Sequence, residues 1–149
     1  MQLSAKADYA LRALLELAER TEPTTADTLA IAQGIPSTFM AQILNDLRRG
    51  GLVTSRRGPG GYRLTRSPAE ITVGDIVRLI DGALFEVCGR PPELSYYDGP
   101  AGHLRDVWLA VQDNLTSLLQ SITLNGILAG QLPAERGDPL LDATRPTTA

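Results

Sequence analysis

Six arginines stand between positions 45 and 66, where Asp46 is the only acidic residue: Arg48, Arg49, Arg56, Arg57, Arg63 and Arg66. Guanidinium groups can neutralise phosphate oxygens. Two amides, Gln42 and Asn45, lie at the start of this region, and side-chain amides can pair with the hydrogen-bonding edge of adenine. These residue types and their spacing indicate contact with nucleic acid, and the alternative is a solvated surface with uneven charge.

The charge of the chain is divided unevenly along its 149 residues, although the formal total is only −3. Residues 1–66 hold nine basic and six acidic residues, a net charge of +3. Residues 67–149 hold five basic and eleven acidic residues, a net charge of −6. Because phosphate contact depends on the local field of one face, the acidic total does not exclude a nucleic-acid partner.

The composition, with 43% hydrophobic residues, fits one folded domain or one domain with an arm. The sequence has no apolar run near the roughly 20 residues that span a bilayer and no signal-peptide pattern at its start. We therefore expect a cytoplasmic protein with no membrane partner. With one cysteine, Cys88, and one histidine, His103, the chain has few ways to build a catalytic site, so we do not expect an enzyme.

The first 51 residues predict three helices joined by short turns. Ser4 and Thr25 can each cap a helix, and apolar residues recur at helical spacing after both, with the first helix over positions 5–20. Gly34 permits a left-handed helix end and Pro36 blocks continuation, so a turn is expected there. Ser37 is the expected cap of a third helix. Its expected buried stripe is Phe39, Met40, Ile43, Leu44 and Leu47.

Two β-prone stretches follow, residues 52–55 and 62–65, around a Gly- and Pro-rich segment that carries Arg56 and Arg57. This segment is longer than a tight two-residue turn, so the hairpin should project as a wing. Thr72 is expected to cap another helix that ends near Gly82. The predicted fold is therefore mainly α with a small β-hairpin, a winged helix-turn-helix over residues 1–82.

The rest of the chain predicts a loop, a long helix and a tail. No helical period holds over residues 83–102, and a loop of this length suggests function or flexibility. From 103 to 124 apolar residues step by three and four, which predicts one helix of roughly 33 Å, longer than a small domain needs for its own core. Residues 131–149 are rich in Pro, Thr, Gly and Asp and are expected to be disordered.

A winged helix-turn-helix places its third helix in the major groove of DNA. The face opposite the buried stripe offers Thr38, Ala41, Gln42 and Asn45 for base contacts. The expected contacts to the DNA backbone or minor groove come from Ser4, Lys6, Tyr9, Arg49, Arg56 and Arg57. Taken singly, Gln42 and Asn45 could be solvated helix residues, and Arg48 and Arg49 could interact only with the helix dipole.

Several stretches of this sequence together resemble one known family. They are Leu3-Ser4-x-Lys6-x-x-Tyr9-Ala10, Ile35-Pro36-Ser37-Thr38-Phe39-Met40, Ile43-Leu44-x-x-Leu47-Arg48, Gly51-Leu52-Val53-x-Ser55-x-Arg57-Gly58-x-x-Gly61-Tyr62-x-Leu64, Ile71-Thr72-Val73-Gly74-Asp75-Ile76-Val77 and Ile80-Asp81-Gly82. The family is the Rrf2 family of bacterial regulators, and the resemblance covers about residues 1–130. It implies a homodimeric transcription factor that binds double-stranded DNA, usually as a repressor.

The same resemblance implies roles for the second half of the chain. The long helix would cross its partner in the dimer, so residues 103–130 form the expected dimerisation segment and residues 83–102 the sensing or linker loop. The expected interface residues are Leu104, Val107, Trp108, Val111, Leu115, Leu118, Leu119 and Ile122. The two-fold symmetry of such a dimer predicts a palindromic operator.

Several members of the family hold an iron–sulfur cluster on three cysteines in the loop before the long helix. This chain has only Cys88 there, and clusters need several thiolate or comparable ligands, so no cofactor is expected. The alternative is a site shared across a dimer by Cys88, Asp8 and His103. Cys88 could instead be a redox thiol or an ordinary loop residue, and Asp8 and His103 have ordinary places at helix starts.

The signal could also be a small molecule or a partner protein. Tyr96 and Tyr97, with Phe85, Leu94 and Trp108, could line an apolar effector pocket, or they could simply pack the loop on the long helix. A different class of function is a winged-helix module that binds protein. The arginine-rich wing argues against that class, because protein interfaces do not require such charge.

Overall fold

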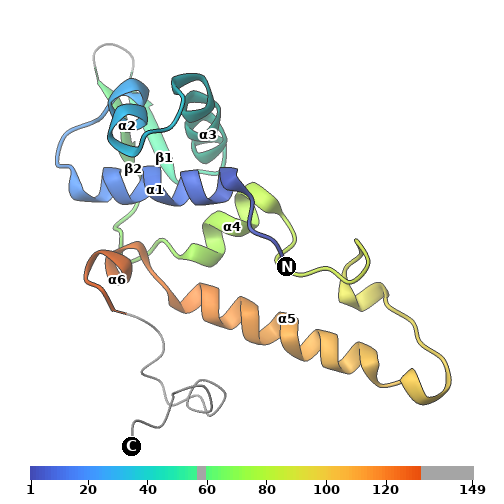
Figure 1. Cartoon of the computed structure of the whole chain (residues 1–149). Coiled ribbons are helices and arrows are strands. Elements are labelled where there is room, and N and C mark those ends of the chain that lie inside the picture. Colours follow the sequence, from blue (N-terminus) through green and yellow to red (C-terminus); the bar gives the residue numbers. More distant parts are fainter. Residues whose placement is uncertain (57–59, 132–149) are drawn as a thin grey trace, which may run out of the picture.

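The computed structural model describes residues 1–56 and 60–131. The elements in chain order are α1 (Ala5–Glu19), α2 (Ala26–Gln33), α3 (Ser37–Arg49), β1 (Val53–Arg56), β2 (Gly61–Leu64), α4 (Val73–Asp81), the 3-10 helices η1 (Pro92–Leu94) and η2 (Gly99–Ala101), α5 (Leu104–Ser121) and α6 (Leu124–Leu128). Figure 1 shows α1–α3 and the hairpin gathered in one unit, from which α5 extends away. The predicted fold class is confirmed: mainly helical, with a hairpin and a long C-terminal helix. Arg57 and the predicted tail from residue 132 onward lie outside the described residues.

Side-chain caps begin α1 and α2 where the sequence predicts them. The Ser4 hydroxyl accepts a hydrogen bond from the Ala7 backbone N–H, and the Thr25 hydroxyl accepts one from Thr28. Each bond satisfies a donor that has no partner within the first helical turn. Gly34 ends α2 in the left-handed conformation at φ 63°, also as predicted.

The helix α3 begins differently from the prediction. Ser37 is already helical, and Pro36 occupies the cap position without a side-chain hydrogen bond. The proline ring holds Pro36 at φ −57°, and its ψ of 135° is the non-helical conformation that a cap residue adopts. Ser37 is therefore not the cap, because the preceding proline already supplies the backbone geometry that starts the helix.

A single apolar cluster holds the three helices, the hairpin and α4 together. Met40, Ile43, Leu44 and Leu47 of α3 are fully buried in it, and Phe39 lies partly buried at its edge. The other buried members are Ala10, Ala13, Leu14, Leu17, Leu29, Ala30, Ile35, Leu52, Val53, Ile71, Ile76 and Leu124. The stripe predicted for the third helix is thus the surface by which α3 is fixed to the rest of the unit.

The hairpin pairs β1 with β2 in antiparallel register, from Val53 opposite Leu64 to Arg56 opposite Gly61. Its base is tied to the segment before α2, because Thr24 and Tyr62 exchange two backbone hydrogen bonds of 2.9 and 2.7 Å. Gly61 stands at this crossing with φ 68°, and a Cβ atom there would press on the Thr24 backbone. Glycine is therefore required both for the backbone conformation and for the close approach.

The prediction of one helix from 103 to 124 is wrong at its C-terminal end. The helix α5 ends at Ser121, and Thr123 caps the short α6 by accepting a hydrogen bond from Gly126. Backbone bonds from Val73 to Ile122 and from Leu124 to Ile71 tie the break to the start of α4. The chain leaves helical geometry there because Leu124 becomes fully buried in the core of the winged unit, which is formed by α1–α4 and the hairpin.

The start of α5 and its C-terminal half have different surroundings. Leu119 packs with Val73 and Val77 of α4, while the remainder of α5 extends from the winged unit (Figure 1). Gly74 allows this packing, because a Cβ atom there would clash with the Gln120 side chain. None of the helices in the described parts of the chain combines the length and apolar character needed to span a membrane.

Candidate nucleic-acid interface

The two faces of α3 have opposite characters. Its buried stripe packs on the core, while Thr38, Ala41 and Gln42 are exposed and Asn45 is half-buried. Helical spacing brings these four predicted base-contact residues to one side, because residues three and four apart lie next to each other on a helix. The structure therefore places an exposed, polar helix face where a winged helix-turn-helix presents its recognition surface.

The two amides of this face differ in their local contacts. Asn45 Oδ1 accepts a hydrogen bond from Arg48 Nη2 at 2.9 Å, which leaves its amide N–H groups to donate. Gln42 forms no side-chain hydrogen bond with any other residue that the structure describes. Gln42 therefore has both halves of its amide available for the paired contact that adenine accepts.

The orientation of α3 depends on a contact that the sequence analysis did not single out. The Arg12 guanidinium of α1 lies over the Tyr9 ring, 5.2 Å from its centroid, and Tyr9 meets Phe39 edge-to-face at 5.6 Å. Arg12 also donates from Nε to Gln33 Oε1 at 2.9 Å and to the Gln33 carbonyl at the end of α2. One arginine thus joins α1 to the end of α2 and, through Tyr9, to the start of α3.

The predicted backbone contacts at the start of α1 are engaged within the chain. Lys6 Nζ lies 2.5 Å from Asp46 Oδ2 on α3. The Ser4 hydroxyl donates to Asp81 at the end of α4 and accepts from Ala7, and the Ser4 backbone N–H also donates to Asp81. Tyr9 is half-buried in the aromatic contact with Phe39. The side chains of Ser4, Lys6 and Tyr9 therefore also hold the start of α1 against α3 and α4.

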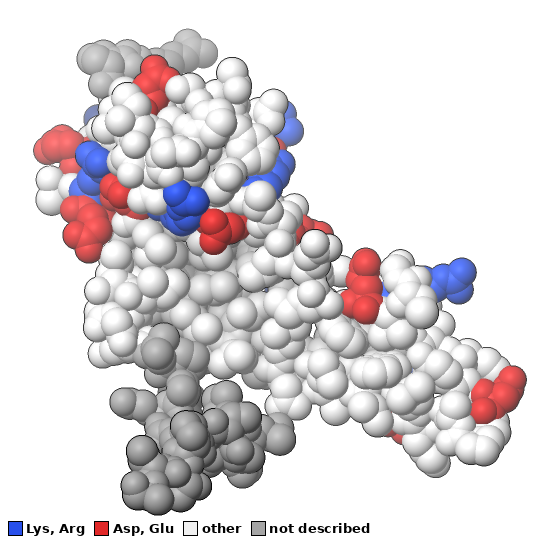
Figure 2. Space-filling model, in the orientation of Figure 1, with Lys and Arg blue, Asp and Glu red and all other residues white. Residues whose placement is uncertain are grey.

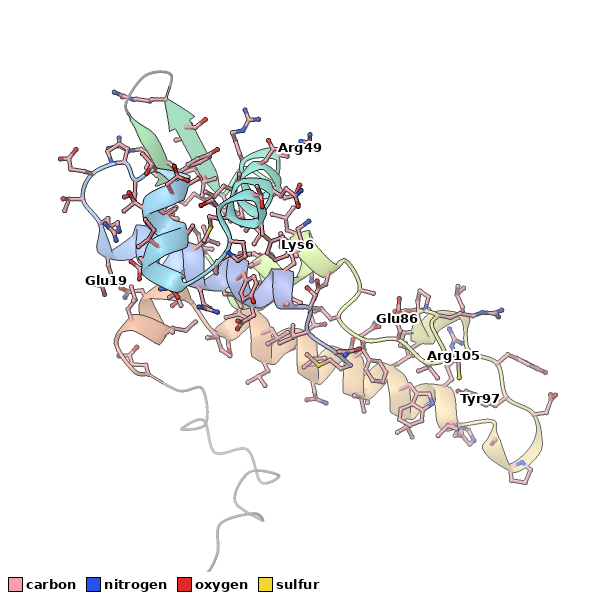
Figure 3. The ribbon with its side chains drawn as sticks, turned by 45° about the horizontal axis from the view of Figure 1, so that its top comes forward. Lys6, Glu19, Arg49, Glu86, Tyr97 and Arg105 are labelled. Carbon is pink, nitrogen blue, oxygen red and sulfur yellow. The ribbon has the colours of Figure 1, made fainter. Side chains whose placement is uncertain are left out.

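The described arginines at the ends of α3 and β1 and on β2 are exposed to solvent. Arg49 ends α3 and Arg56 ends β1, and both are exposed (Figure 3, where Arg49 is labelled). Arg63 on β2 is exposed as well, and Arg57 lies outside the described residues. In Figure 2 several of the visible Lys and Arg groups lie on the winged unit, interleaved with acidic groups, whereas the visible surface of α5 is largely uncharged.

The unit has three helices, of which the third packs on the core by its apolar stripe, and an adjoining hairpin. These features define a winged helix-turn-helix protein of the DNA-binding class. The family model described as Rrf2, iron-dependent transcriptional regulator, matches residues 3–130. The chain therefore belongs to the Rrf2 family of transcriptional regulators, and the resemblance noted in the sequence is confirmed. Its named relatives are transcriptional regulators rather than enzymes.

Relatives with known sequences or structures support the same assignment. The chain is 44% identical over 140 residues to the HTH-type transcriptional regulator Rv1287 of Mycobacterium tuberculosis, covering 89% of this chain and 84% of that one. The solved structure of CymR, the global cysteine regulator of Bacillus subtilis, has a TM-score of 0.72 at 31% identity, covering 87% and 98% of the two chains. IscR of T. potens has a TM-score of 0.70 at 30% identity, covering 95% and 96%.

The predicted sensing residues have different surroundings in the described part of the chain. Tyr97 accepts a hydrogen bond from Trp108 Nε1 at 3.2 Å, and Phe85 lies 6.3 Å from the Trp108 ring, so these residues pack the loop on α5. Tyr96 is exposed. A groove of about 1050 Å³ lies instead between the N-terminal residues and the loop after α4, and of the predicted pocket residues only Phe85 lines it.

A polar contact adds to the packing of this loop on α5. Gln112 Nε2 donates to Glu93 Oε1 at 2.6 Å. This hydrogen bond, a backbone hydrogen bond and the positive charge of Arg105 lower the pKa of the Glu93 carboxyl. Because the pKa of Glu93 is lowered in the folded chain, the contact stabilises the fold above the ordinary pKa of a glutamate. This stabilisation is lost as the pH falls through the lowered pKa.

The described residues do not provide the donor set of an iron–sulfur cluster. Cys88, the only thiol, is exposed and has φ 52°. Asp8 lies 3.6 Å from Arg12, and His103 Nδ1 lies 3.3 Å from Asp106. No group of three or more His, Cys, Asp or Glu side chains within the described ranges could hold a metal ion. The three-cysteine cluster of the family does not fit this chain.

The apolar stripe predicted on the long helix is partly uncovered. Val107, Val111 and Leu118 of α5 are 50, 40 and 43% exposed, whereas Leu119 is buried against α4. Leu104, Trp108, Leu115 and Ile122 are half-buried. The three exposed residues are spaced by four and seven positions, so they form one row along the part of α5 that extends from the winged unit.

Proposed function

We propose that this DNA-binding regulator acts as a homodimer that recognises a palindromic operator and represses transcription without an iron–sulfur cluster. The observation that carries the proposal is the division of α3 into a fully buried stripe and an exposed face with Thr38, Ala41 and Gln42. A helix anchored in this way can enter the major groove without losing its packing.

Each part of the interface has a separate role in the proposal. Thr38, Ala41, Gln42 and Asn45 read base edges from α3. Arg49, Arg56 and Arg57 neutralise phosphates or enter the minor groove beside the wing. Ser4 and Tyr9 are the proposed contacts to the DNA backbone from α1, whereas Lys6, also predicted there, is paired with Asp46 in the free chain. The contacts of all three residues within the chain also set the position of α1.

The exposed row on α5 supports the homodimer. Val107, Val111 and Leu118 would be covered by the same helix of a second copy, together with the half-buried residues Leu104, Trp108, Leu115 and Ile122 and the buried Leu119. A two-fold dimer presents two equivalent recognition helices, which accounts for a palindromic operator. Since its partner is chromosomal DNA, the dimer would act in the bacterial cytoplasm.

Recovery of bound duplexes from a random-sequence pool tests this proposal. We expect the recovered sequences to share an inverted repeat with half-sites about one helical turn apart. Placing that repeat over a reporter promoter should lower transcription when the protein is present. Recovery of sequences without a shared repeat would contradict sequence-specific recognition, and a rise in reporter transcription would contradict repression.

The signal that controls the regulator is assigned to residues 83–102 and their contacts with α5. Cys88, Tyr96 and Tyr97 are the candidate sensing residues, and the effector would be a small molecule or a protein. The absence of a cluster is tested by the visible absorption spectrum and by iron and sulfide analysis of anaerobically purified protein. Cluster absorption with stoichiometric iron and sulfide would contradict this part of the proposal.

A further inference from the structure

Lys6 and Asp46 form an ion pair at the edge of the proposed DNA interface. Lys6 Nζ lies 2.5 Å from Asp46 Oδ2, and the two side chains are 37 and 33% exposed. Asp46 follows Gln42 by four residues and precedes Arg49 by three, so helical spacing places its carboxylate beside the face proposed to contact DNA. An acidic group at this position is unexpected, because it faces a polyanion.

The neighbouring contacts keep Lys6 close to Asp46. Ser4, at the start of the same helix, is held by its backbone N–H and hydroxyl bonds to Asp81 of α4. Asp8, the acidic residue in the first turn of α1, faces Arg12 at 3.6 Å. Asp46 is thus the carboxylate that neutralises Lys6, and a half-buried pair is screened less by salt than a fully exposed one.

We propose that Asp46 is a specificity-determining residue that withholds Lys6 from the phosphates of DNA of arbitrary sequence. This inference rests on the proposed function. Binding to arbitrary DNA depends almost entirely on phosphate neutralisation, so each cation removed from that contact lowers non-specific affinity. A regulator must find its operator among a large excess of other sites, and weaker binding to those sites lowers the share of the protein that they hold.

Salt-dependent binding of the full chain to a labelled duplex of arbitrary sequence tests the inference. Asp46→Asn should bind on the order of eight-fold more tightly at about 0.1 M salt. The slope of log affinity against log salt should become steeper by about 0.9, the change expected for one additional phosphate contact. Adding Lys6→Gln to Asp46→Asn should restore the wild-type slope, because the released cation is then missing.

Two single variants complete the experiment. Asp106→Asn changes the formal charge by the same amount on α5, where Asp106 faces His103, and it should leave the slope unchanged. Lys6→Gln alone should also leave the slope unchanged, because Lys6 is already occupied by Asp46. A shallower slope in this variant would overturn the inference even if Asp46→Asn does not fold.

An unchanged slope in folded Asp46→Asn would overturn the inference and reduce the ion pair to a link between α1 and α3. A shallower slope in Lys6→Gln alone would also overturn it, since Lys6 would then contact phosphate despite Asp46. Both results would leave the proposed function intact. If the wild-type chain showed no salt-dependent binding, the proposed function would fail and this inference with it.

Discussion

Gln42 and Arg56 would make two different kinds of DNA contact in the proposed interface. Gln42 lies exposed in the middle of α3 and carries no charge, so a contact with a base edge would distinguish one sequence from another. Arg56 lies exposed at the end of β1, where a contact with phosphate would be the same for every sequence. Substitution of each residue should therefore affect a different property of binding.

Gln42→Ala should change the preference among sites more than the binding to arbitrary DNA. Loss of one bidentate base contact costs about 1–3 kcal/mol of discrimination. The measurement is a competition between the recovered operator and its single-base variants, with Thr28→Ala on α2 as a control outside the base-reading face. An equal loss of affinity for all duplexes would make Gln42 a positioning contact instead.

Arg56→Ala should weaken binding to all duplexes by a similar factor. The slope of log affinity against log salt should become shallower by about 0.9, since one phosphate contact is lost. The comparison is a salt titration beside Arg90→Ala, which removes an exposed arginine from the loop before α5. If both variants kept the wild-type slope, Arg56 would not contact phosphate.

The position of α3, the proposed recognition helix, depends on links between elements that are distant in the sequence. Arg12 joins α1 to the end of α2 and, through Tyr9 and Phe39, to the start of α3. The Thr24–Tyr62 bridge joins the hairpin to the segment before α2. The hairpin and α3 are therefore held on one framework, with Gly61 at its closest backbone approach.

Gly61→Ala should destabilise the fold more than Gly34→Ala. Both glycines have positive φ, at 68° and 63°, so alanine at either site costs about 1–2 kcal/mol in backbone conformation. At Gly61 the new methyl group would also press on the Thr24 backbone, which adds about 1–3 kcal/mol, whereas Gly34 has open space around it. Denaturant unfolding of both variants measures the difference, and equal losses would contradict the close approach at Gly61.

The described part of the chain forms a winged unit from which α5 extends (Figure 1). The end of α5 is fixed by Leu119 against α4 and by Leu124 in the main core. The exposed apolar row runs along α5 from Leu118, next to this anchor, to Val107. This arrangement leaves the row available to a second copy while the recognition helix stays in the winged unit.

Val111→Glu should convert the proposed dimer to a monomer without unfolding the winged unit. A carboxylate in the centre of an apolar interface loses its hydration with no partner to compensate, which costs several kcal/mol. Analytical ultracentrifugation measures the change in mass, and Ile31→Glu on the exposed surface of α2 is the matched substitution. A Val111→Glu chain that remained dimeric would show that another surface joins the copies.

Local sequence patterns predict α1 to α4, the hairpin and the exposed face of α3. A cap such as Ser4 or Thr25 acts on the next turn, and a buried stripe follows the helical period, so both depend on neighbours in the sequence. The start of α3 at Ser37 was missed by one position, because the sequence analysis assigned to Ser37 the role that Pro36 performs.

Only the folded chain shows the break after Ser121 and the contacts of Arg12 and Lys6. The apolar spacing over residues 103–124 is compatible with one helix, and packing of Leu124 in a core built from residues far earlier in the sequence interrupts it. Arg12 meets Gln33, 21 residues later, and Lys6 of α1 meets Asp46 of α3. Short-range patterns specify which helices form, whereas partners across the core decide where a helix must stop and which charges are neutralised, because they depend on how the helices pack.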